Sequence, residues 1–294
     1  MPELDAAAVT VASDICALPL ARRLAALLDR DPGSLREGDP LPHGWHAMLF
    51  NLPTRQCDLR DDGSADLGVP LPDIGLPRLM LGGRHNRFPG EIPIGAHLKR
   101  ETRRGAVQLK EGRSGRFALV AVEHRLFVEG QDQPAVVEQL DYMLREANRP
   151  PASAAAPDVS DPAKVTAAAL ASAPVTSSAL PSPIATRVLL PDERLLFRYS
   201  AITDNPHRIH YDRSYATEQE GYPALIVNGS LPAMFLLEMF RRHIGREPRT
   251  FSSRNLAPMF CAKPLTLKLA RDEQAWRLWA EDEQGRTTFD ARAE

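Results

Sequence analysis

The strongly apolar segment NGSLPAMFLLEMFRRHIG, residues 228–245, limits the folds that this chain can adopt more than any other part of the sequence. Between residues 231 and 240 its only charged side chain is Glu238. A helix that lies on a protein surface keeps a polar outer face, whereas a helix that is apolar on nearly every side must be enclosed. The segment therefore predicts a buried central helix.

Both ends of this segment carry helix signals. Asn228 and Ser230 are candidate N-caps, Pro232 falls in the first turn, and Gly245 follows the last turn. Extended segments come next, and the middle ones alternate polar and apolar residues: RTFSSRNLAPMF, PLTLKLARD, AWRLWAED and RTTFDARA. A buried helix followed by antiparallel strands predicts a sheet curled around that helix.

The first half of the chain has a similar order. Residues 18–30, LPLARRLAALLDR, predict an amphipathic helix, and LPHGWHAMLFNLP predicts a loop that enters a buried segment. Further on, HLKRETRRGAVQLKEG and RFALVAVEHRLFVEG predict antiparallel strands. Residues 149–183 are rich in Ala, Pro and Ser without any aromatic residue, which is typical of a linker. Two domains are expected, residues 1–148 and 184–294.

Composition and charge narrow the class of protein. The chain has 294 residues and a formal net charge of −2, so it has no overall field for nucleic acid or an anionic membrane. Its three cysteines form no CxxC pair, which argues against a disulfide framework or a cysteine zinc site and favours a reducing compartment. No apolar run approaches the ~20 residues of a membrane span, and the acidic N-terminus lacks the basic start of a secretory signal. A cytoplasmic protein is expected.

The loop ITDNPHRIHYD, residues 202–212, concentrates two His, two Asp, one Asn and one Arg around a Pro. A polar surface loop is one interpretation. An active site is the other, because a histidine exchanges protons near neutral pH and a neighbouring carboxylate can orient it.

This loop resembles the hydratase motif of MaoC-like enzymes, in which an Asp, an Asn-Pro pair and a His-x-Asp precede the central helix. Here the order is Asp204, Asn205, Pro206, His210 and Asp212, followed by GYPALIVNGSL. In the first half, GDPLPHGWHAMLF and RLMLGGRHNRFPGEIPIG are similar to the degenerate N-terminal half of double hot-dog proteins, in the group of mesaconyl-CoA hydratases and type 2 hydroxyacyl-thioester dehydratases. The resemblance implies an α+β, double hot-dog fold: two curved antiparallel sheets, each wrapped around a central helix, in one chain.

Two departures from the motif bear on the site. Asp204 and His210 are six positions apart, where simple MaoC-like hydratases have five, and His207 and Arg208 lengthen the interval between Asn and His. Asn228 stands where a His commonly precedes the helix glycine.

The resemblance assigns the chemistry to the C-terminal half. His210 and Asp204 are expected to be catalytic, with Asn205 orienting the water or the loop. Amides at the start of the helix, beside Gly229 and Asn228, are expected to hold the thioester oxygen, because a residue without Cβ allows a close approach.

Other side chains are expected to contact or support the substrate site. Arg208 would meet the substrate carboxylate or a CoA phosphate, and Tyr211 would support His210. Structural alternatives stay open: turn chemistry for Asp204 and Asn205, an exposed position for His207, and a salt bridge from Arg208 to Asp212 or Glu218.

The first half is expected to complete the substrate tunnel, since no hydratase motif occurs in it. Its basic residues between Arg84 and Arg116 suit exposed strand faces, although Arg84 and Arg87 are also weaker candidates for a CoA phosphate. Trp45 and His46 are expected to be core and loop residues rather than catalytic ones.

The predicted function is reversible hydration of the C=C bond of an enoyl-CoA thioester, most simply a small branched dicarboxylic acyl-CoA of the mesaconyl or itaconyl type. CoA enters as the substrate's handle, no cofactor or metal is expected, and a homodimer is a possible assembly. Alternatives are a (3R)-hydroxyacyl-thioester dehydratase of medium-chain acyl groups, a hot-dog thioesterase and a non-catalytic acyl-CoA-binding protein. A metal site on Asp204, His207, His210 and Asp212 is a further alternative, although these residues fit no compact zinc signature.

Overall fold

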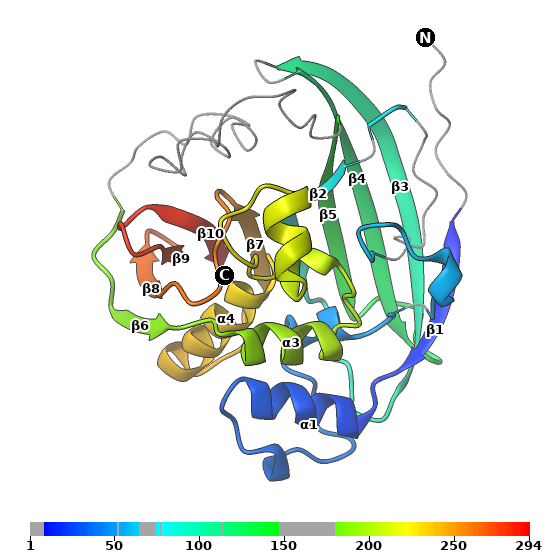
Figure 1. Cartoon of the computed structure of the whole chain (residues 1–294). Helices are drawn as coiled ribbons and strands as arrows, with labels where there is room; N and C mark the ends of the chain where they lie inside the picture. The colour runs from blue at the N-terminus through cyan, green and yellow to red at the C-terminus, as the bar shows by residue number, and fades with distance from the viewer. Residues whose placement is uncertain (1–8, 52, 65–73, 77, 113–114, 147–179) are drawn as a thin grey trace, which may run out of the picture.

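The computed structural model describes residues 9–51, 53–64, 74–76, 78–112, 115–146 and 180–294 (Figure 1). The strands of this part of the chain are β1 (Thr10–Ile15), β2 (Arg78–Arg87), β3 (His97–Gly112), β4 (Gly115–Val128), β5 (Val136–Arg145), β6 (Ala185–Leu189), β7 (Thr250–Asn255), β8 (Leu265–Asp272), β9 (Ala275–Glu281) and β10 (Thr287–Ala293). The helices are α1 (Leu18–Leu27), α3 (Glu193–Ile202) and α4 (Leu231–Ile244), with short turns η1 (Pro32–Ser34), η2 (Trp45–Met48), η3 (Gln56–Asp58), η4 (Arg208–His210) and η5 (Tyr215–Gln219).

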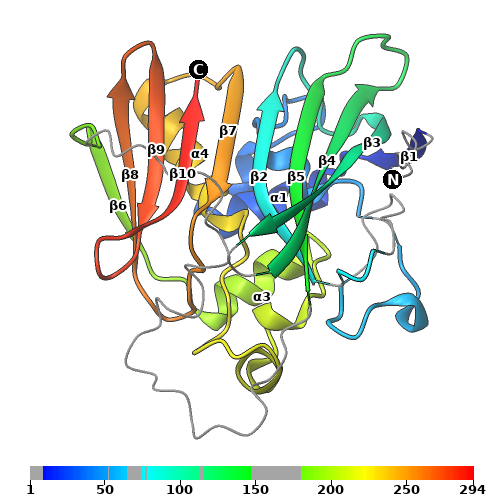
Figure 2. The same cartoon turned by 90° about the horizontal axis from the view of Figure 1, so that it is seen from above.

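All these strands belong to one sheet with the order β1-β3-β4-β5-β2-β7-β10-β9-β8-β6. Taken from its two edges inward, the sheet repeats one pattern, β1-β3-β4-β5-β2 and β6-β8-β9-β10-β7. The halves join where β2 pairs antiparallel with β7 (Figure 2). Each half of the chain therefore builds the same five-stranded unit, and the sheet runs unbroken from one unit into the other.

Helix α4 is the enclosed helix that the sequence predicts. Every residue from Leu231 to Phe240 is buried, and Gly245 ends the helix with a left-handed backbone at φ 75°. The C-terminal strands curve around α4, while α1 and α3 lie side by side below it (Figure 1). The prediction of a sheet curled around this helix is confirmed.

The N-terminal half differs from the C-terminal half at the position of its central helix. Between α1 and β2 it has η2, a single 3-10 turn, where the C-terminal half has α4. Gly44, at φ 90°, precedes this turn, and a Cβ there would lie 2.4 Å from the Leu237 side chain of α4. The double hot-dog fold is confirmed, but the expected central helix of the N-terminal half is only the turn η2, which packs against α4 at Gly44.

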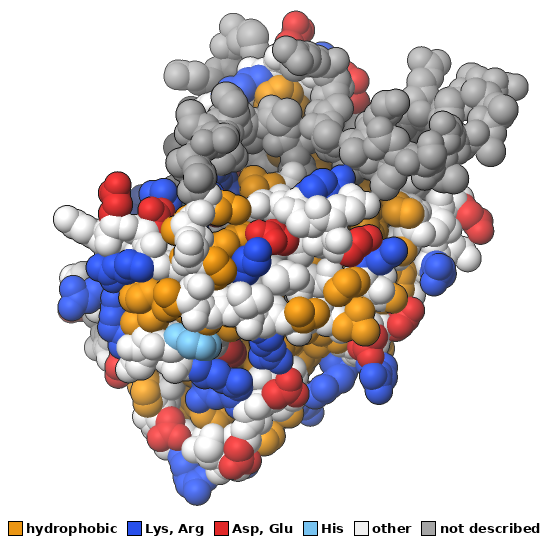
Figure 3. All heavy atoms as spheres, turned by 90° about the vertical axis from the view of Figure 1, so that its left-hand side faces the viewer, with side chains coloured by type: hydrophobic (Ala, Val, Ile, Leu, Met, Phe, Trp, Pro, Cys, Tyr) orange, Lys and Arg blue, Asp and Glu red, His pale blue; other side chains and the backbone are white. Residues whose placement is uncertain are grey.

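Three further facts concern the surface charge, the helices and the expected linker. On the face seen in Figure 3, acidic and basic side chains are interspersed, so this face shows no field of one sign. None of the helices in the described ranges is long and apolar enough to span a bilayer. The expected linker, residues 149–183, lies outside the described residues up to residue 179, so the domain boundaries stay a prediction.

Candidate active site between the two halves

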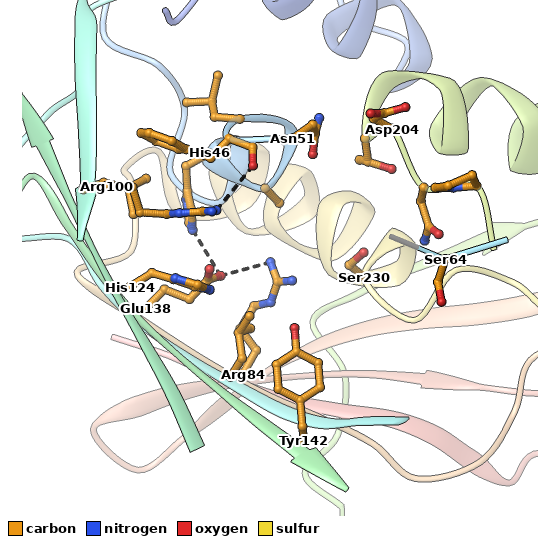
Figure 4. A pocket seen from close by; sticks show the side chains of 18 residues that line it. His46, Asn51, Ser64, Arg84, Arg100, His124, Glu138, Tyr142, Asp204 and Ser230 are labelled. Atoms are coloured by element: carbon orange, nitrogen blue, oxygen red, sulfur yellow. Dashed lines mark hydrogen bonds and ion pairs between the residues drawn. The ribbon is translucent and has the colours of Figure 1, made fainter. Parts of the chain in front are cut away.

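A cavity of about 320 Å³ lies between the two halves of the chain (Figure 4). One wall comes from the motif loop after α3 and from the start of α4: Thr203, Asp204, Asn205, Pro206 and Ser230. The other wall comes from η2 and the segment after it, Ser64, and the inner faces of β2 to β5: His46, Ala47, Leu49, Phe50, Asn51, Ser64, Arg84, Arg100, His124, Leu126, Glu138, Leu140 and Tyr142. The hydratase-like motif therefore faces the N-terminal half across a shared cavity.

The end of α3 brings the motif loop to this cavity. Asp204 follows the helix with a left-handed backbone at φ 43°, and the Asn205 amide donates to the Ser200 carbonyl at 2.9 Å. The Asn205 Oδ1 accepts from the His207 amide at 3.2 Å, so Asn205 makes the turn at Pro206. Among the described residues, the Asp204 carboxylate has no hydrogen-bond or ion-pair partner. The loop thus places one unpaired carboxylate on the cavity wall.

His210 is held in one tautomer beneath the surface. Its ring is 6% exposed, and its Nδ1 lies 2.8 Å from the Ile226 carbonyl oxygen. A carbonyl only accepts, so Nδ1 carries the proton and Nε2 is the basic nitrogen. Burial lowers the pKa of His210 to about 4, so the ring is neutral at pH 7. The ring does not line the cavity itself, which leaves its predicted catalytic role a prediction.

The predicted oxyanion residues lie beside the cavity rather than on its wall. Asn228 is 1% exposed, and its Nδ2 donates to the Ser200 Oγ at 3.2 Å. A Cβ on Gly229 would lie 3.0 Å from the Asn255 Nδ2, so the close approach that needs this glycine is made by the Asn255 amide. The start of α4 reaches the cavity one residue later, at Ser230, whose Oγ accepts from the Tyr199 hydroxyl at 2.8 Å.

Arg208 and Tyr211 do not line the cavity either. The Arg208 Nη2 lies 2.8 Å from the Asp212 Oδ2, and its guanidinium stacks over the Tyr215 ring at 4.1 Å. The salt-bridge alternative for Arg208 is therefore confirmed, and the side chain is occupied by it. Tyr211 is 51% exposed.

A turn from the N-terminal half holds the motif loop from outside. The Arg208 amide donates to the Asp62 carbonyl at 2.8 Å, and the Asp62 carboxylate lies 3.9 Å from the His207 Nε2. Gly63, at φ 83°, packs so closely that a Cβ would lie 2.3 Å from the Pro206 carbonyl oxygen. The sequence gives no local signal for this contact, because the two segments are distant along the chain.

Replacing Gly63 by Ala is expected to displace the motif loop and to lower kcat/KM by about 10²-fold, since a shift of ~1 Å in a catalytic group has an effect of that size. The matched control is Gly38→Ala. Gly38 has a similar φ of 87°, but a Cβ there meets nothing within 4 Å. Equal losses of activity in the two variants would contradict the contact with Pro206 and would point to backbone strain alone.

The N-terminal wall carries a row of buried polar side chains that the sequence did not single out as a site. His124 pairs with Thr102 on β3 and with Glu138 on β5 in the sheet register. Thr102 Oγ1 lies 2.8 Å from the His124 Nδ1, and the Glu138 carboxylate lies 3.3 Å from the His46 Nε2 and 3.1 Å from an Arg84 nitrogen. Of these residues, His46, Arg84, His124 and Glu138 line the cavity (Figure 4).

The charges in this row are set by burial and by neighbours. Burial alone would raise the pKa of Glu138, but Arg84 and His46 outweigh it and hold that pKa well below its usual range. Burial lowers the pKa of His124 to about 4 and raises the pKa of Tyr142 to about 12. The wall thus holds an ionised Glu138, a neutral His124 and a neutral phenol.

His46 is a loop residue and is buried, as predicted, yet its ring also lines the cavity. A signal for the row was available in the strand pattern. In β4 the inward positions Val122 and Leu126 are apolar, and His124 interrupts them; in β5 Glu138 interrupts Val136 and Leu140 in the same way.

Lowering the pH from 7 to 5 is expected to destabilise the protein. The pKa values of His124 and His210 are about 4 in the folded state, whereas histidines of the unfolded chain titrate near ~6.5. Between these values the unfolded state binds more protons, so each histidine can remove about 1.4 kcal/mol of unfolding free energy per pH unit as the pH falls. Their contribution is complete above ~6.5 and is lost toward pH 4. Urea denaturation at pH 7, 6 and 5 measures this slope. In His124→Gln the slope should become smaller, and an unchanged slope would contradict the assignment.

Comparison with known proteins places the fold and the loop together in one family. Residues 44–261 match the family described as hydroxyacyl-thioester dehydratase type 2, Htd2. Over 284 residues the chain is 35% identical to a mesaconyl-C(4)-CoA hydratase of Chloroflexus aurantiacus, covering 97% of this chain and 94% of that protein.

Solved structures agree on the fold. A MaoC-like dehydratase from Phytophthora capsici superposes with a TM-score of 0.66 at 11% identity, covering 97% of this chain and 94% of that one. A Mycobacterium tuberculosis protein described as having a double hotdog fold superposes with a TM-score of 0.56 at 18% identity, covering 99% and 97%.

In the ranges that the structure describes, no three His, Cys, Asp or Glu side chains gather closely enough to hold a metal ion. The metal alternative on the motif loop therefore gains no support from the geometry. The family match spans most of the chain, and the named hydratase is similar over nearly its whole length. The chain accordingly belongs to the hydroxyacyl-thioester dehydratase type 2 family of MaoC-like, double hot-dog hydro-lyases.

Proposed function

We propose that the protein reversibly hydrates the C=C bond of a small branched dicarboxylic enoyl-CoA thioester of the mesaconyl-C4-CoA type. The observation that carries this proposal is the cavity, which Asp204 lines, exposed and without an ion-pair partner among the described residues, opposite a wall with two arginines. Its volume of about 320 Å³ lies at the lower end of the ~300–1,000 Å³ range of ligand sites, which suits a short acyl group. The named hydratase relative supports the same substrate class.

In the proposed reaction, Asp204 accepts a proton from the water that adds to the β-carbon of the enoyl group. A carboxylate without a protein partner is free to hold that water, and general base assistance of this kind typically contributes about 10²–10⁴-fold. The proton that Asp204 has taken from the water is then delivered to the α-carbon, while donors near the start of α4 stabilise the enolate oxygen, so that one water is added in total. The same steps in reverse order dehydrate the hydroxyacyl thioester.

His210 has a supporting place in this proposal. It is neutral, and its protonated Nδ1 is fixed on the Ile226 carbonyl, so its Nε2 can accept a proton. Because the ring does not line the cavity, the proton reaches it through one water or through a small movement of the loop when substrate binds.

The proposal includes the setting in which the protein works. The reaction needs no cofactor, and CoA serves only as the substrate's handle. Cys16, Cys57 and Cys261 are free thiols, which supports a cytoplasmic, reducing compartment. The expected homodimer stays a prediction that sedimentation equilibrium would test.

The test is a panel of CoA esters: mesaconyl-C4-CoA, crotonyl-CoA and a medium-chain 2-enoyl-CoA. The ultraviolet absorbance of the conjugated enone should fall most rapidly with mesaconyl-C4-CoA, and a thiol reagent should detect no free CoA. Release of thiol with every ester would indicate hydrolysis and would overturn the proposal. Preference for the medium-chain ester would overturn the substrate class.

A further inference from the structure

Arg100 is a cavity-lining cation whose charge no carboxylate of the described residues neutralises at close range. It belongs to β3, and its guanidinium points into the cavity from the N-terminal wall (Figure 4). In the part of the chain that the structure describes, no acidic oxygen lies within ion-pair distance of it. Its recorded contacts are a long hydrogen bond from Nη1 to the Phe50 carbonyl at 3.4 Å and stacking on the Phe50 ring at 5.0 Å.

The guanidinium is also poorly satisfied by hydrogen bonds. The Arg100 Nε is fully buried and has no partner. Burial lowers the pKa of Arg100, but the ordinary value of an arginine is so high that the group stays charged at pH 7. Glu138 and Asp14 attract it only from beyond ion-pair distance. A partly desolvated cation in this position is strongly stabilised by an anion that enters the cavity.

Arg84 lies on the same wall as Arg100, but it has a carboxylate within ion-pair distance. It lies 3.1 Å from the Glu138 carboxylate, which also contacts His46. One glutamate therefore faces two arginines on the N-terminal wall, and the excess positive charge belongs to Arg100. The opposite wall carries the Asp204 carboxylate, which repels an anion. An anionic group of the substrate is thus attracted to one end of the cavity and repelled from the other.

We infer that Arg100 binds the free carboxylate of the dicarboxylic acyl group, so that the N-terminal half selects dicarboxylic over monocarboxylic thioesters. This inference rests on the proposed function and names the residue that sets its substrate class. A planar guanidinium fork matches a carboxylate with two parallel hydrogen bonds. In an enedioyl monothioester the double bond lies between the carboxylate and the thioester. Anchoring the carboxylate at Arg100 therefore directs the double bond toward the wall that carries Asp204. The sequence suggested Arg208 as a partner of the substrate carboxylate, but Arg208 pairs with Asp212 instead.

The test compares two saturated thioesters, succinyl-CoA and butyryl-CoA, which have no C=C bond to hydrate. They differ at the end of the acyl chain, where succinyl-CoA has a carboxylate and butyryl-CoA a methyl group. Calorimetry on the wild-type protein should show tighter binding of succinyl-CoA. In Arg100→Gln the ratio of the two affinities should fall by about 10- to 100-fold, the range for one charge-assisted hydrogen-bonded contact. Arg100→Lys keeps the charge but loses the fork, so it should retain part of the preference.

The matched control is Arg103→Gln, since Arg103 lies on the same strand with its side chain exposed. Its affinity ratio should equal that of the wild type. An unchanged ratio in Arg100→Gln, or an equal fall in Arg103→Gln, would overturn the inference. Thermal melting of each variant checks that it folds. If Arg100→Gln does not fold, an unchanged affinity ratio in Arg100→Lys would overturn the inference. Because binding is measured without turnover, a wild type that prefers succinyl-CoA but hydrates no enoyl-CoA would refute the proposed function alone.

Discussion

His210→Ala should lower kcat for hydration by about 10²–10⁴-fold while leaving KM nearly unchanged, because the variant loses a proton acceptor and not a binding contact. The ring is buried and neutral, and its Nδ1 is fixed on the Ile226 carbonyl. Nε2 has no hydrogen-bond partner among the described residues, so it is available to accept a proton. The measurement is the initial fall of enone absorbance at saturating and limiting substrate.

Two further measurements separate catalysis from structure in this variant. His85→Ala is the matched control, because His85 is exposed on β2 and its ring pairs with Asp141, away from the cavity. Its kcat should equal that of the wild type. The wild-type pH profile should also stay flat on the acid side down to about pH 5, since the pKa of His210 is about 4. Undiminished kcat in His210→Ala would remove this residue from the mechanism and leave Asp204 as the only proton acceptor of the motif.

Arg241→Ala should lower the free energy of unfolding by about 3–5 kcal/mol, because it leaves a charged Glu238 buried inside the protein. Glu238 is 2% exposed on α4, and its Oε1 lies 2.7 Å from the Arg241 Nη1. Arg241 also bonds Glu247 and the His43 carbonyl, so it ties α4 to the N-terminal half. Arg30 stays 3.6 Å from Glu238, which favours the lower end of the range. Urea denaturation at pH 7 measures the change.

The control for this prediction is Arg242→Ala, since Arg242 is exposed on the same helix and should change stability by less than ~0.5 kcal/mol. Adding Glu238→Gln to Arg241→Ala removes the unpaired charge and should restore part of the loss. If the double variant is no more stable than Arg241→Ala, the cost comes from lost packing rather than from the buried charge.

The elements with strong local patterns were predictable from the sequence. The enclosed helix was evident because nearly every side of residues 231–240 is apolar, and a position inside a curved sheet is the arrangement that buries such a helix fully. The long strands β3 and β4 coincide with the two segments of the first half that were expected to be extended. The motif loop was recognised from its residue order, and the family comparison supports that recognition.

Only the C-terminal wall of the site was partly predictable from the sequence. Asp204 and Asn205 line the cavity, but Arg208, Tyr211 and Gly229 do not. Arg208 was ambiguous because both a substrate anion and Asp212 suit a guanidinium, and only the fold shows which one is near. Gly229 was assigned to the substrate because a missing Cβ signals a close approach without naming the group that approaches, which here is Asn255.

The strand pattern could mark His124 and Glu138 as polar residues on buried strand faces, but it could not show that they form one wall, because the parts of that wall meet through strand pairing. Thr102, His124 and Glu138 come from three strands, and their alignment depends on the register of β3, β4 and β5. A shift of one residue in any pairing would turn a side chain to the other face of the sheet. His46 and the turn at Gly63 reach the cavity from loops whose course the strands and α4 determine.

Periodicity and residue order are local properties of the chain, so they were enough to predict the buried helix, the strands around it and the residues of the motif loop. The groups that face this loop depend on the tertiary structure. Pairing of β2 with β7 brings the inner face of the N-terminal strands opposite Asp204. That placement leaves Arg100 unneutralised in the cavity, because the charge around a side chain depends on neighbours that lie far away along the chain.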